Sequence, residues 1–285
     1  MKNIYEETKF LMKKYNLTAN KKLGQNFLID DEAIDKIVDS ANLTKEDLVM
    51  EIGPGLGTLT SMLLEKAGKV IAIELDDRMV KILQDRFLVY NNFELINEDV
   101  LKVNLPELIE ANKQFKSVKV VANLPYYITT PIIMKLLENK LNIESITIMI
   151  QKEVAERIVA TTGSKLSGAI TYSVHYYAEP EEVTIVPNIS FIPSPEVDSE
   201  VIKLVIRKEP PVELKDEKLF FNIIKASFMQ RRKTLANGLV NGGILQNKTE
   251  AVKLLKNIGL EENVRGEELS LEQFAKLSNE IYLRK

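Results

Sequence analysis

Short, mostly apolar runs rich in β-branched residues alternate with segments of helical periodicity over the first 150 residues. Such runs predict strands buried on both faces, and the segments between them, with apolar positions three and four residues apart, predict amphipathic helices. Strands that alternate with helices indicate a parallel, doubly wound sheet with right-handed crossovers. The predicted strands are residues 48–52, 70–74, 93–96, 118–122 and 146–150, and between them lie helical segments at 58–66, 78–89 and 131–138 and a short turn at 105–110.

Two further apolar runs, 183–186 and 201–206, flank a proline-rich turn at 191–199 and predict a final pair of strands that closes this sheet. Pro210 and Pro211 then break the chain, because proline continues neither a strand ladder nor the interior of a helix. Only helical periodicity follows. The four helices predicted there are 218–228, 232–239, 250–257 and 271–282.

The proline break divides the sequence into two predicted domains. Residues 1–208 form an α/β domain that opens with an amphipathic stretch and a loop at 21–28, a candidate lid or ligand arm. Residues 209–285 form a smaller, all-helical domain. The composition agrees, because 285 residues with 45% hydrophobic positions exceed one typical domain and can bury a sizeable core.

Composition excludes several classes of protein. No stretch approaches the roughly 18 uninterrupted apolar residues of a spanning helix, and the polar start lacks the apolar block of a signal peptide, so we expect a cytoplasmic protein with no membrane partner. Cysteine is absent, which excludes disulfides, thiolate metal sites and cysteine nucleophiles. No cluster of His, Asp and Glu has the spacing of metal ligands, and no metal is expected.

The formal net charge of −3 hides an uneven distribution of charge. Residues 1–200 carry 22 Lys and Arg against 30 Asp and Glu, whereas residues 201–285 carry 16 against 11. The C-terminal part is therefore relatively basic, which suits either a polyanionic partner or an ordinary solvated helical surface.

A glycine loop follows the first predicted strand, with Gly53, Gly55 and Gly57 at every second position and Glu51 two residues before them. Glycine lets the backbone turn sharply and approach a ligand closely. Glu74 ends the next strand, where a carboxylate can accept hydrogen bonds from both hydroxyls of a ribose. Because the glycine spacing differs from the G-x-G-x-x-G of dinucleotide sites, the loop favours S-adenosylmethionine as the cofactor.

Asp99 comes just after the third predicted strand. At that edge of the sheet its carboxylate can meet the amine of an adenine. The alternative for an isolated aspartate at this place is a helix cap.

The tetrapeptide Asn123 to Tyr126 lies at the end of the fourth predicted strand. An exocyclic amine is a poor nucleophile, and the Asn123 side-chain oxygen with the backbone carbonyl region of Pro125 can accept its two N–H bonds and direct its lone pair at a methyl group. Tyr126, and Phe191 in the proline-rich turn, supply aromatic faces for a splayed base. Methylation of cytosine C5 is disfavoured because it usually proceeds through a cysteine adduct, and this chain has no cysteine. An ordinary turn at the end of a strand is the alternative.

Together these motifs resemble the ribosomal RNA adenine N6,N6-dimethyltransferases, most closely the small-subunit (16S) members, over nearly the whole chain. The resemblance implies a class I, Rossmann-like methyltransferase fold with a smaller C-terminal helical domain. It also implies dimethylation of two adjacent adenosines near the 3′ end of 16S rRNA in an assembling small subunit. The motifs that carry it are LGQNFL at 23–28, the glycine loop, NLPYYI at 123–128, FIPSPEVDS at 191–199 and FMQRRKTL at 228–235.

Functional residues are carried over from the family by motif, and S-adenosylmethionine is the implied cofactor. The implied cofactor-binding residues are Asn26, Leu28, Gly53, Gly55, Glu74, Asp99 and Asn123. The implied target-base pocket consists of Asn123, Pro125, Tyr126 and Phe191.

Contacts with RNA are expected in the basic C-terminal domain, which we interpret as the region that recognises RNA or the subunit. Arg231, Arg232 and Lys233, at the start of a predicted helix, are the first candidates for contact with phosphates, and Lys21 and Lys22 extend the set. Short basic runs are often plain surface, but cations at a helix N-terminus are unfavourable unless an anion arrives. The protein is expected to act as a monomer.

Two alternatives stay open at this point. A large-subunit (23S) rRNA adenine dimethyltransferase would share the cofactor and base motifs, although the segment 228–235 and the C-terminal helices favour the small-subunit enzyme. The second alternative is that the protein serves mainly as a non-catalytic ribosome assembly factor. A DNA adenine methyltransferase is disfavoured, because these enzymes usually carry Pro-Pro-Tyr where this chain has Leu124-Pro125-Tyr126.

Overall fold

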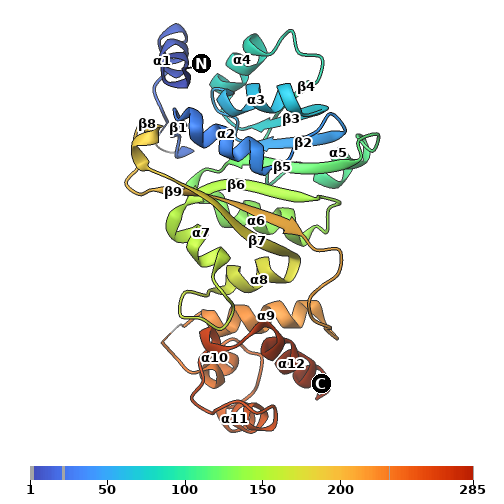
Figure 1. Cartoon of the computed structure of the whole chain (residues 1–285). Helices are drawn as coiled ribbons and strands as arrows, with labels where there is room; N and C mark the ends of the chain where they lie inside the picture. The colour runs from blue at the N-terminus through green and yellow to red at the C-terminus, as the bar shows by residue number, and fades with distance from the viewer. Residues whose placement is uncertain (1–2, 21–22, 231, 285) are drawn as a thin grey trace. The chain divides into compact units, whose positions relative to one another are not determined.

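The computed structural model describes residues 3–20, 23–230 and 232–284, and its centre is a seven-stranded sheet (Figure 1). Strands β2 to β6 pair in parallel, and β9 pairs antiparallel with β6. The strand order across the sheet is β4 (Phe93–Asn97), β3 (Lys69–Glu74), β2 (Asp47–Ile52), β5 (Ser117–Asn123), β6 (Ser145–Gln151), β9 (Ser199–Ile206) and β7 (Ala178–Val186).

The predicted strands and the α/β fold class are confirmed, and the last two strands close the sheet as expected. The strand order reverses between β2 and β5, since the chain moves from β2 towards β4 on one side and continues from β5 on the other. In an open parallel sheet the carboxyl ends of the strands at such a switch point form the usual ligand crevice. The glycine loop follows β2. The tetrapeptide Asn123 to Tyr126, called the acceptor tetrapeptide after its predicted role, begins at the end of β5, so the topology brings both motifs to this crevice.

Helices cover the sheet and bury their apolar stripes against it. α2 (Asp31–Ser40) buries Ala33, Ile34, Ile37 and Val38 on one face, and Asp30 caps this helix by accepting a hydrogen bond from the Ala33 N–H at 3.1 Å. Apolar residues of α2, α3 (Thr58–Lys66) and α4 (Asp77–Arg86) share one core cluster with residues of the sheet. The remaining helices before β7 are α1 (Ile4–Lys14), α5 (Leu105–Glu110), α6 (Thr129–Glu138), α7 (Lys152–Val159) and α8 (Ala169–Tyr177).

The chain divides into two compact units, and each is built from two separate segments of the sequence. The first unit comprises Met1–Ala155 and Glu181–Ile206, and the second comprises Glu156–Pro180 and Arg207–Lys285. This division differs from the single boundary predicted at residue 208.

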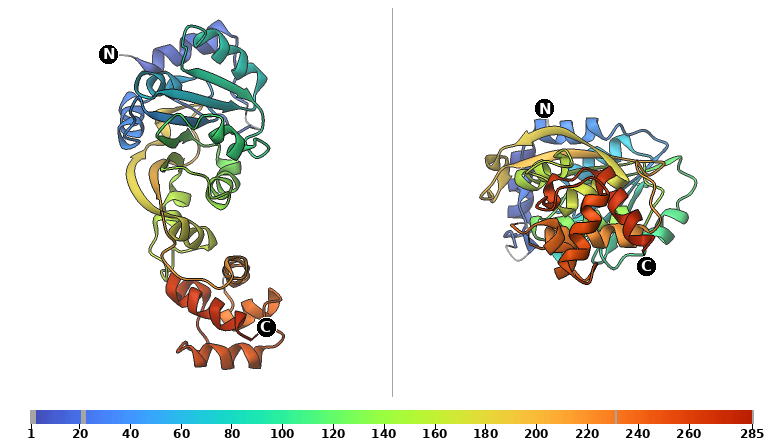
Figure 2. Two further views of the ribbon diagram at one scale, coloured as in Figure 1. Left: turned by 90° about the vertical axis from the view of Figure 1, so that its right-hand side faces the viewer. Right: turned by 90° about the horizontal axis from the view of Figure 1, so that it is seen from below.

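The difference arises because α8 packs with the C-terminal helices. Its Tyr172 and Tyr176 belong to the core cluster of the second unit. The Tyr172 hydroxyl donates to the Leu269 carbonyl at 2.6 Å, and its ring meets that of Phe274 edge-on with centroids 4.9 Å apart. These C-terminal helices, coloured orange to red, form one group in Figure 2. They are α9 (Glu217–Phe228), α10 (Leu235–Asn241), α11 (Lys248–Asn257) and α12 (Leu271–Tyr282).

None of the helices within the described ranges is long and apolar enough to cross a membrane.

Close packing at the turn into β3 leads to a first prediction. A Cβ on Gly68 would lie 2.2 Å from the carbonyl oxygen of Lys45, a backbone atom that cannot move aside like the end of a side chain. We expect Gly68→Ala to lower the free energy of unfolding in urea by at least about 2 kcal/mol. Gly243→Ala is the control, because its Cβ would meet open space and only its φ of +70° is strained, at a cost of about 1 kcal/mol. Equal losses in the two variants would contradict the steric argument.

Candidate active site

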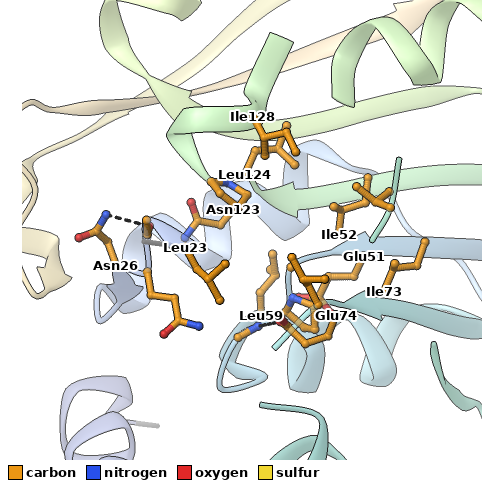
Figure 3. Close-up of a pocket in the computed structure, with 18 of the residues that line it drawn as sticks. Leu23, Asn26, Glu51, Ile52, Leu59, Ile73, Glu74, Asn123, Leu124 and Ile128 are labelled. Atoms are coloured by element: carbon orange, nitrogen blue, oxygen red, sulfur yellow. Dashed lines mark hydrogen bonds between the residues drawn. The ribbon is translucent and has the colours of Figure 1, made fainter. Parts of the chain in front are cut away.

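A pocket opens at the carboxyl ends of β2, β3 and β5, at the switch point of the sheet (Figure 3). The N-terminal arm, which we define as residues 18–20 and 23–28, contributes its residues 23–28 to the wall. The glycine loop, Glu74 and Asp99 contribute another part, and residues 123–128 complete it. Segments that the sequence analysis singled out separately therefore line one cavity.

The glycine loop is held in a conformation that side chains rarely adopt. Gly53, Gly55 and Gly57 all have positive φ, of +67°, +59° and +80°. A Cβ on Gly57 would lie 2.6 Å from the ring of Phe87, so this glycine also allows α3 to pack against α4. At Gly53 a Cβ would lie 3.9 Å from the Pro125 side chain, so the loop directly borders the acceptor tetrapeptide.

Glu74 is the carboxylate that joins the glycine loop to the end of β3. Its Oε2 accepts a hydrogen bond from the Gly55 N–H at 3.1 Å, and its Oε1 accepts one from the Asp76 N–H at 2.8 Å. Burial raises the pKa of Glu74, and these backbone hydrogen bonds oppose that shift. The two bonds fix the carboxylate in one orientation and leave further lone pairs for a ligand.

Glu51 lies in the wall of the pocket and is 1% exposed. Burial, with a smaller contribution from the charge of Glu74, raises its pKa to about 8. Within the described part of the chain, its buried Oε2 has no hydrogen-bond partner. A buried carboxyl with an unpartnered oxygen is costly and suits a ligand that brings a hydrogen-bond donor or a cation.

The raised pKa of Glu51 leads to a second prediction. The pKa of Glu51 is about 8 in the folded protein and 4.5, its usual value, in the unfolded chain. Between these two pH values the folded protein keeps a proton that the unfolded chain releases, so the contribution of Glu51 to the free energy of unfolding falls as pH rises. We expect the unfolding free energy of Glu51→Gln minus that of the unmodified protein, both measured in urea titrations, to increase from pH 5 to pH 8. A difference in unfolding free energy that does not change with pH would contradict the raised pKa of Glu51.

The N-terminal arm is tied to the end of β3 by a cluster that the sequence analysis missed. The Asp76 Oδ2 accepts from the Gln25 Nε2 at 2.8 Å and from the Arg78 Nη2 at 2.6 Å. Arg78 also donates to the carbonyl of Thr18 at 3.3 Å, and its guanidinium holds the pKa of Asp76 below the usual range. Since Asp76 donates its own N–H to Glu74, the arm and the Glu74 carboxylate are positioned by one network.

The far end of the arm is held by a short sheet. β1 (Phe27–Leu28) pairs antiparallel with β8 (Phe191–Ile192), which places Leu28 opposite Phe191. Asn26 donates from Nδ2 to the carbonyl of Gly24 at 3.2 Å, and its side chain and that of Asn123 belong to the same group of pocket residues (Figure 3). Asn26 and Leu28 thus lie at the pocket, as the family resemblance implies.

Phe191 lies next to the described lining of the pocket, opposite Leu28 in the β1–β8 pair. It is 3% exposed, belongs to the core cluster of the first unit, and is not among the described residues that line the pocket. Its role as one face of a base pocket remains a prediction.

The acceptor tetrapeptide turns from β5 into a short 3-10 helix, η2 (Tyr126–Ile128). The Tyr126 hydroxyl is 2.6 Å from the Ser199 Oγ, which fixes the ring from the side of β9. The Pro125 carbonyl accepts from the Ile128 N–H at 3.2 Å and from the Thr129 hydroxyl at 3.1 Å. Both of its lone pairs are therefore engaged, and the predicted use of this carbonyl by a substrate amine is disfavoured.

The remaining predicted residues have mixed positions. Asp99 lines the pocket, and its Oδ1 accepts from the Leu101 N–H at 2.9 Å within a turn and not at the start of a helix. Its contact with an adenine amine remains a prediction. Arg232 and Lys233 are exposed in the turn before α10, which begins only after its N-cap Thr234. Arg231, Lys21 and Lys22 lie outside the described residues. Among the residues that are described, no group of three or more His, Asp and Glu is arranged to hold a metal.

The sheet order, the glycine loop at the switch point and the carboxylate at the end of the next strand define a methyltransferase of the Rossmann-like class. The chain belongs to the ribosomal RNA adenine dimethylase family, whose model matches residues 16–283. The family resemblance seen in the motifs is thereby confirmed.

Relatives of known name support this assignment over almost the full length. A ribosomal RNA small subunit methyltransferase A from Lachnoclostridium phytofermentans is 48% identical, with 97% of this chain and 96% of the relative covered. The protein of the same name from Clostridium botulinum strain Kyoto is 51% identical, with 96% and 98% covered.

Two solved structures are similar in fold. A dimethyladenosine transferase from Plasmodium falciparum superposes with a TM-score of 0.74 at 30% identity, covering 88% of this chain and 95% of that one. The 23S rRNA methyltransferase ErmE superposes with a TM-score of 0.68 at 26% identity, covering 90% and 100%.

Proposed function

We propose that the protein transfers methyl groups from S-adenosylmethionine to the N6 amines of two adjacent adenosines near the 3′ end of 16S rRNA, giving N6,N6-dimethyladenosine. The observation that carries the proposal is the meeting of the glycine loop and the acceptor tetrapeptide in one pocket, where a Cβ on Gly53 would lie 3.9 Å from Pro125. The names of the relatives supply the choice of RNA, and the proposed place of action is the cytoplasm.

The charges of the pocket suit this cofactor. Glu51, Glu74, Glu98 and Asp99 line it, and the described lining residues include no Lys, Arg or His. S-adenosylmethionine carries a sulfonium and an ammonium, and when bound it supplies an electrophilic methyl group. Glu51 has the unpartnered oxygen for the ammonium, the oriented carboxylate of Glu74 accepts from the ribose hydroxyls, and Asp99 accepts from the adenine amine.

The acceptor amine is positioned by the residues at the end of β5. The Asn123 Oδ1 accepts one N–H of the adenine amine, which turns the nitrogen lone pair towards the methyl group and stabilises the positive charge that develops on nitrogen. Because the Pro125 carbonyl already accepts two bonds, the carbonyl of Leu124, another lining residue, accepts the second N–H. Tyr126, anchored by Ser199, provides a face for the flipped base.

Two of the RNA contacts proposed from the sequence, Arg232 and Lys233, fall on exposed cations. Arg232 and Lys233 are exposed in the second unit, and Arg231, Lys21 and Lys22 complete the proposed set. Such contacts neutralise phosphates and release counterions, which makes binding depend on salt. The helical second unit is accordingly the proposed region for recognition of RNA or the subunit, with the protein acting as a monomer.

The function is tested by offering labelled S-adenosylmethionine with undermodified small subunits, large subunits and DNA in separate reactions, and by identifying the product nucleosides. We expect N6,N6-dimethyladenosine in small-subunit RNA. Label on cytosine, or on DNA alone, would overturn the proposal, and label only in large subunits would establish the 23S alternative.

The assembly-factor alternative is tested in cells that lack the protein. A copy carrying Asn123→Ala is compared with the unmodified copy for maturation of small subunits. If the variant restores maturation fully without methylation, binding to the subunit rather than catalysis is the main role.

A further inference from the structure

Tyr127 is an exposed aromatic residue at the wall of the active-site pocket. Its side chain lines the pocket together with Asn123, and 56% of the residue is exposed. The preceding Tyr126 is half-buried, with its hydroxyl 2.6 Å from Ser199. Two consecutive tyrosines of η2 thus have different environments, and only the second presents a large part of its surface to solvent.

One side of the Tyr127 ring is covered by the N-terminal arm. A Cβ on Gly24 would lie 3.4 Å from the Tyr127 Cδ1, so the backbone of the arm reaches the ring directly. Gly24 has a φ of +59°, and its neighbour Gln25 is anchored to Asp76 at 2.8 Å. The Cδ1–Cε1 edge of the ring is therefore supported by backbone that is itself held in place, while more than half of the residue's surface is exposed to solvent.

We propose that Tyr127 is a stacking platform for the nucleotide next to the target adenosine, which is the other adenosine of the pair. This inference rests on the proposed function. While one adenine amine lies at Asn123, its neighbour in the strand must unstack from it and needs a second apolar surface close by. An aromatic ring supported on one side and open elsewhere offers that surface, and stacking on it is a common way to hold single-stranded RNA.

A platform of this kind has a consequence for a double modification. Stacking uses the face of a base and not its N–H groups, so it accepts an adenine before and after its amine has been methylated. Asn123 accepts a hydrogen bond from the amine, whereas Tyr127 contacts only the face of the base. The platform can therefore hold the neighbouring adenosine both before and after that adenosine has itself been methylated.

The test is a double-mutant cycle on reconstituted, undermodified small subunits. One partner change is Tyr127→Ala, and the other replaces one adenosine of the pair by uridine, whose smaller base stacks less well. We expect each single change to lower kcat/KM for the remaining adenosine about tenfold, mainly through KM. With both changes present the loss should stay near tenfold, because the second change has nothing left to remove.

Further variants separate stacking from other effects. Tyr127→Phe keeps the ring and should retain the sensitivity to the neighbouring base, whereas Tyr127→Leu keeps apolar bulk without a ring and should lose it. Phe10→Ala removes an aromatic of the first unit that is 63% exposed on α1, and the full effect of the uridine change should persist in it. Thermal unfolding identifies any misfolded variant, and if Tyr127→Ala is one, the Phe and Leu variants replace it in the comparison.

The outcomes distinguish this inference from the function on which it rests. Multiplicative losses in the cycle, or a Tyr127→Leu enzyme as sensitive to the neighbouring base as the unmodified one, would overturn the platform while methylation by the unmodified protein stands. If the unmodified protein transfers no methyl group to small-subunit RNA, the proposed function fails, and the platform fails with it.

Discussion

Asn123→Ala is expected to lower kcat on small subunits at least about a hundredfold, because the variant loses the oxygen that orients the amine and stabilises its developing charge. Asn123 ends β5 and lies at the pocket beside Leu124, on a buried strand that fixes its position. The dissociation constant for S-adenosylmethionine, measured by calorimetry, should change much less than kcat does. This pattern would place the role of the side chain in the transition state.

A conservative change sharpens this prediction. Asn123→Asp keeps an acceptor oxygen and nearly the same shape, so it should retain more turnover than Asn123→Ala. If Asn123→Ala instead weakens cofactor binding as strongly as it lowers kcat, its main role is to hold the cofactor, and the mechanism proposed for the amine is wrong.

Glu74→Ala is expected to weaken binding of S-adenosylmethionine at least about a hundredfold. The variant loses the two hydrogen bonds that the carboxylate would accept from the ribose, each worth about 1.5 kcal/mol or more. It also releases the N–H groups of Gly55 and Asp76, which Glu74 holds at 3.1 and 2.8 Å, so the loop loses its fixed geometry. Calorimetric titration measures the loss directly.

Glu98→Gln is the matched control for this variant. Glu98 lines the same pocket but is exposed to solvent, and its Oε1 accepts a hydrogen bond from the adjacent Asp99 N–H. Its replacement should change the dissociation constant less than about threefold, since exposed charges interact weakly through water. Similar losses in the two variants would indicate a general effect of pocket charge rather than a specific bond from Glu74.

The strands and the two motif-bearing turns could be predicted because their signals are local. The helix predicted at 58–66 has the observed bounds Thr58–Lys66, since it starts directly after a glycine with positive φ. The last helix, predicted at 271–282, is also observed there, where Ser270 and Gln273 form a capping box. By contrast, α10 begins three residues later than predicted, because the cations Arg232 and Lys233 lie in the turn before its cap.

The elements that were missed depend on partners distant in sequence. α7 and α8 were not predicted, and the packing of α8 depends on residues about a hundred positions further along, such as Leu269, which accepts from Tyr172. In the same way, the two-residue strand β1 is defined only by its pairing with β8, and no local pattern marks it. Periodicity records which face of a segment is apolar, but not which other segment will cover it.

The site was predictable in its parts, and less so in its connections. Motifs identified Glu74, Asp99 and Asn123, and all three lie at the pocket. Nothing in the sequence indicated that Asp76 ties the arm to β3, because a lone Asp before a helix is most simply a cap. The sequence also did not indicate that the Pro125 carbonyl is engaged, because this depends on the hydrogen bonds of the turn that follows it.

The discontinuity of the second unit sets the boundaries for exchanging parts between relatives. A hybrid that replaces only residues 207–285 would bring a foreign Phe274 and Leu269 against the native Tyr172, although the ring contact and the buried hydroxyl bond require matched shapes. A chain ended at residue 206 would keep α8 without the helices that cover Tyr172 and Tyr176, and apolar surface uncovered in this way promotes aggregation. The transferable module is therefore residues 156–180 together with 207–285, moved as one piece.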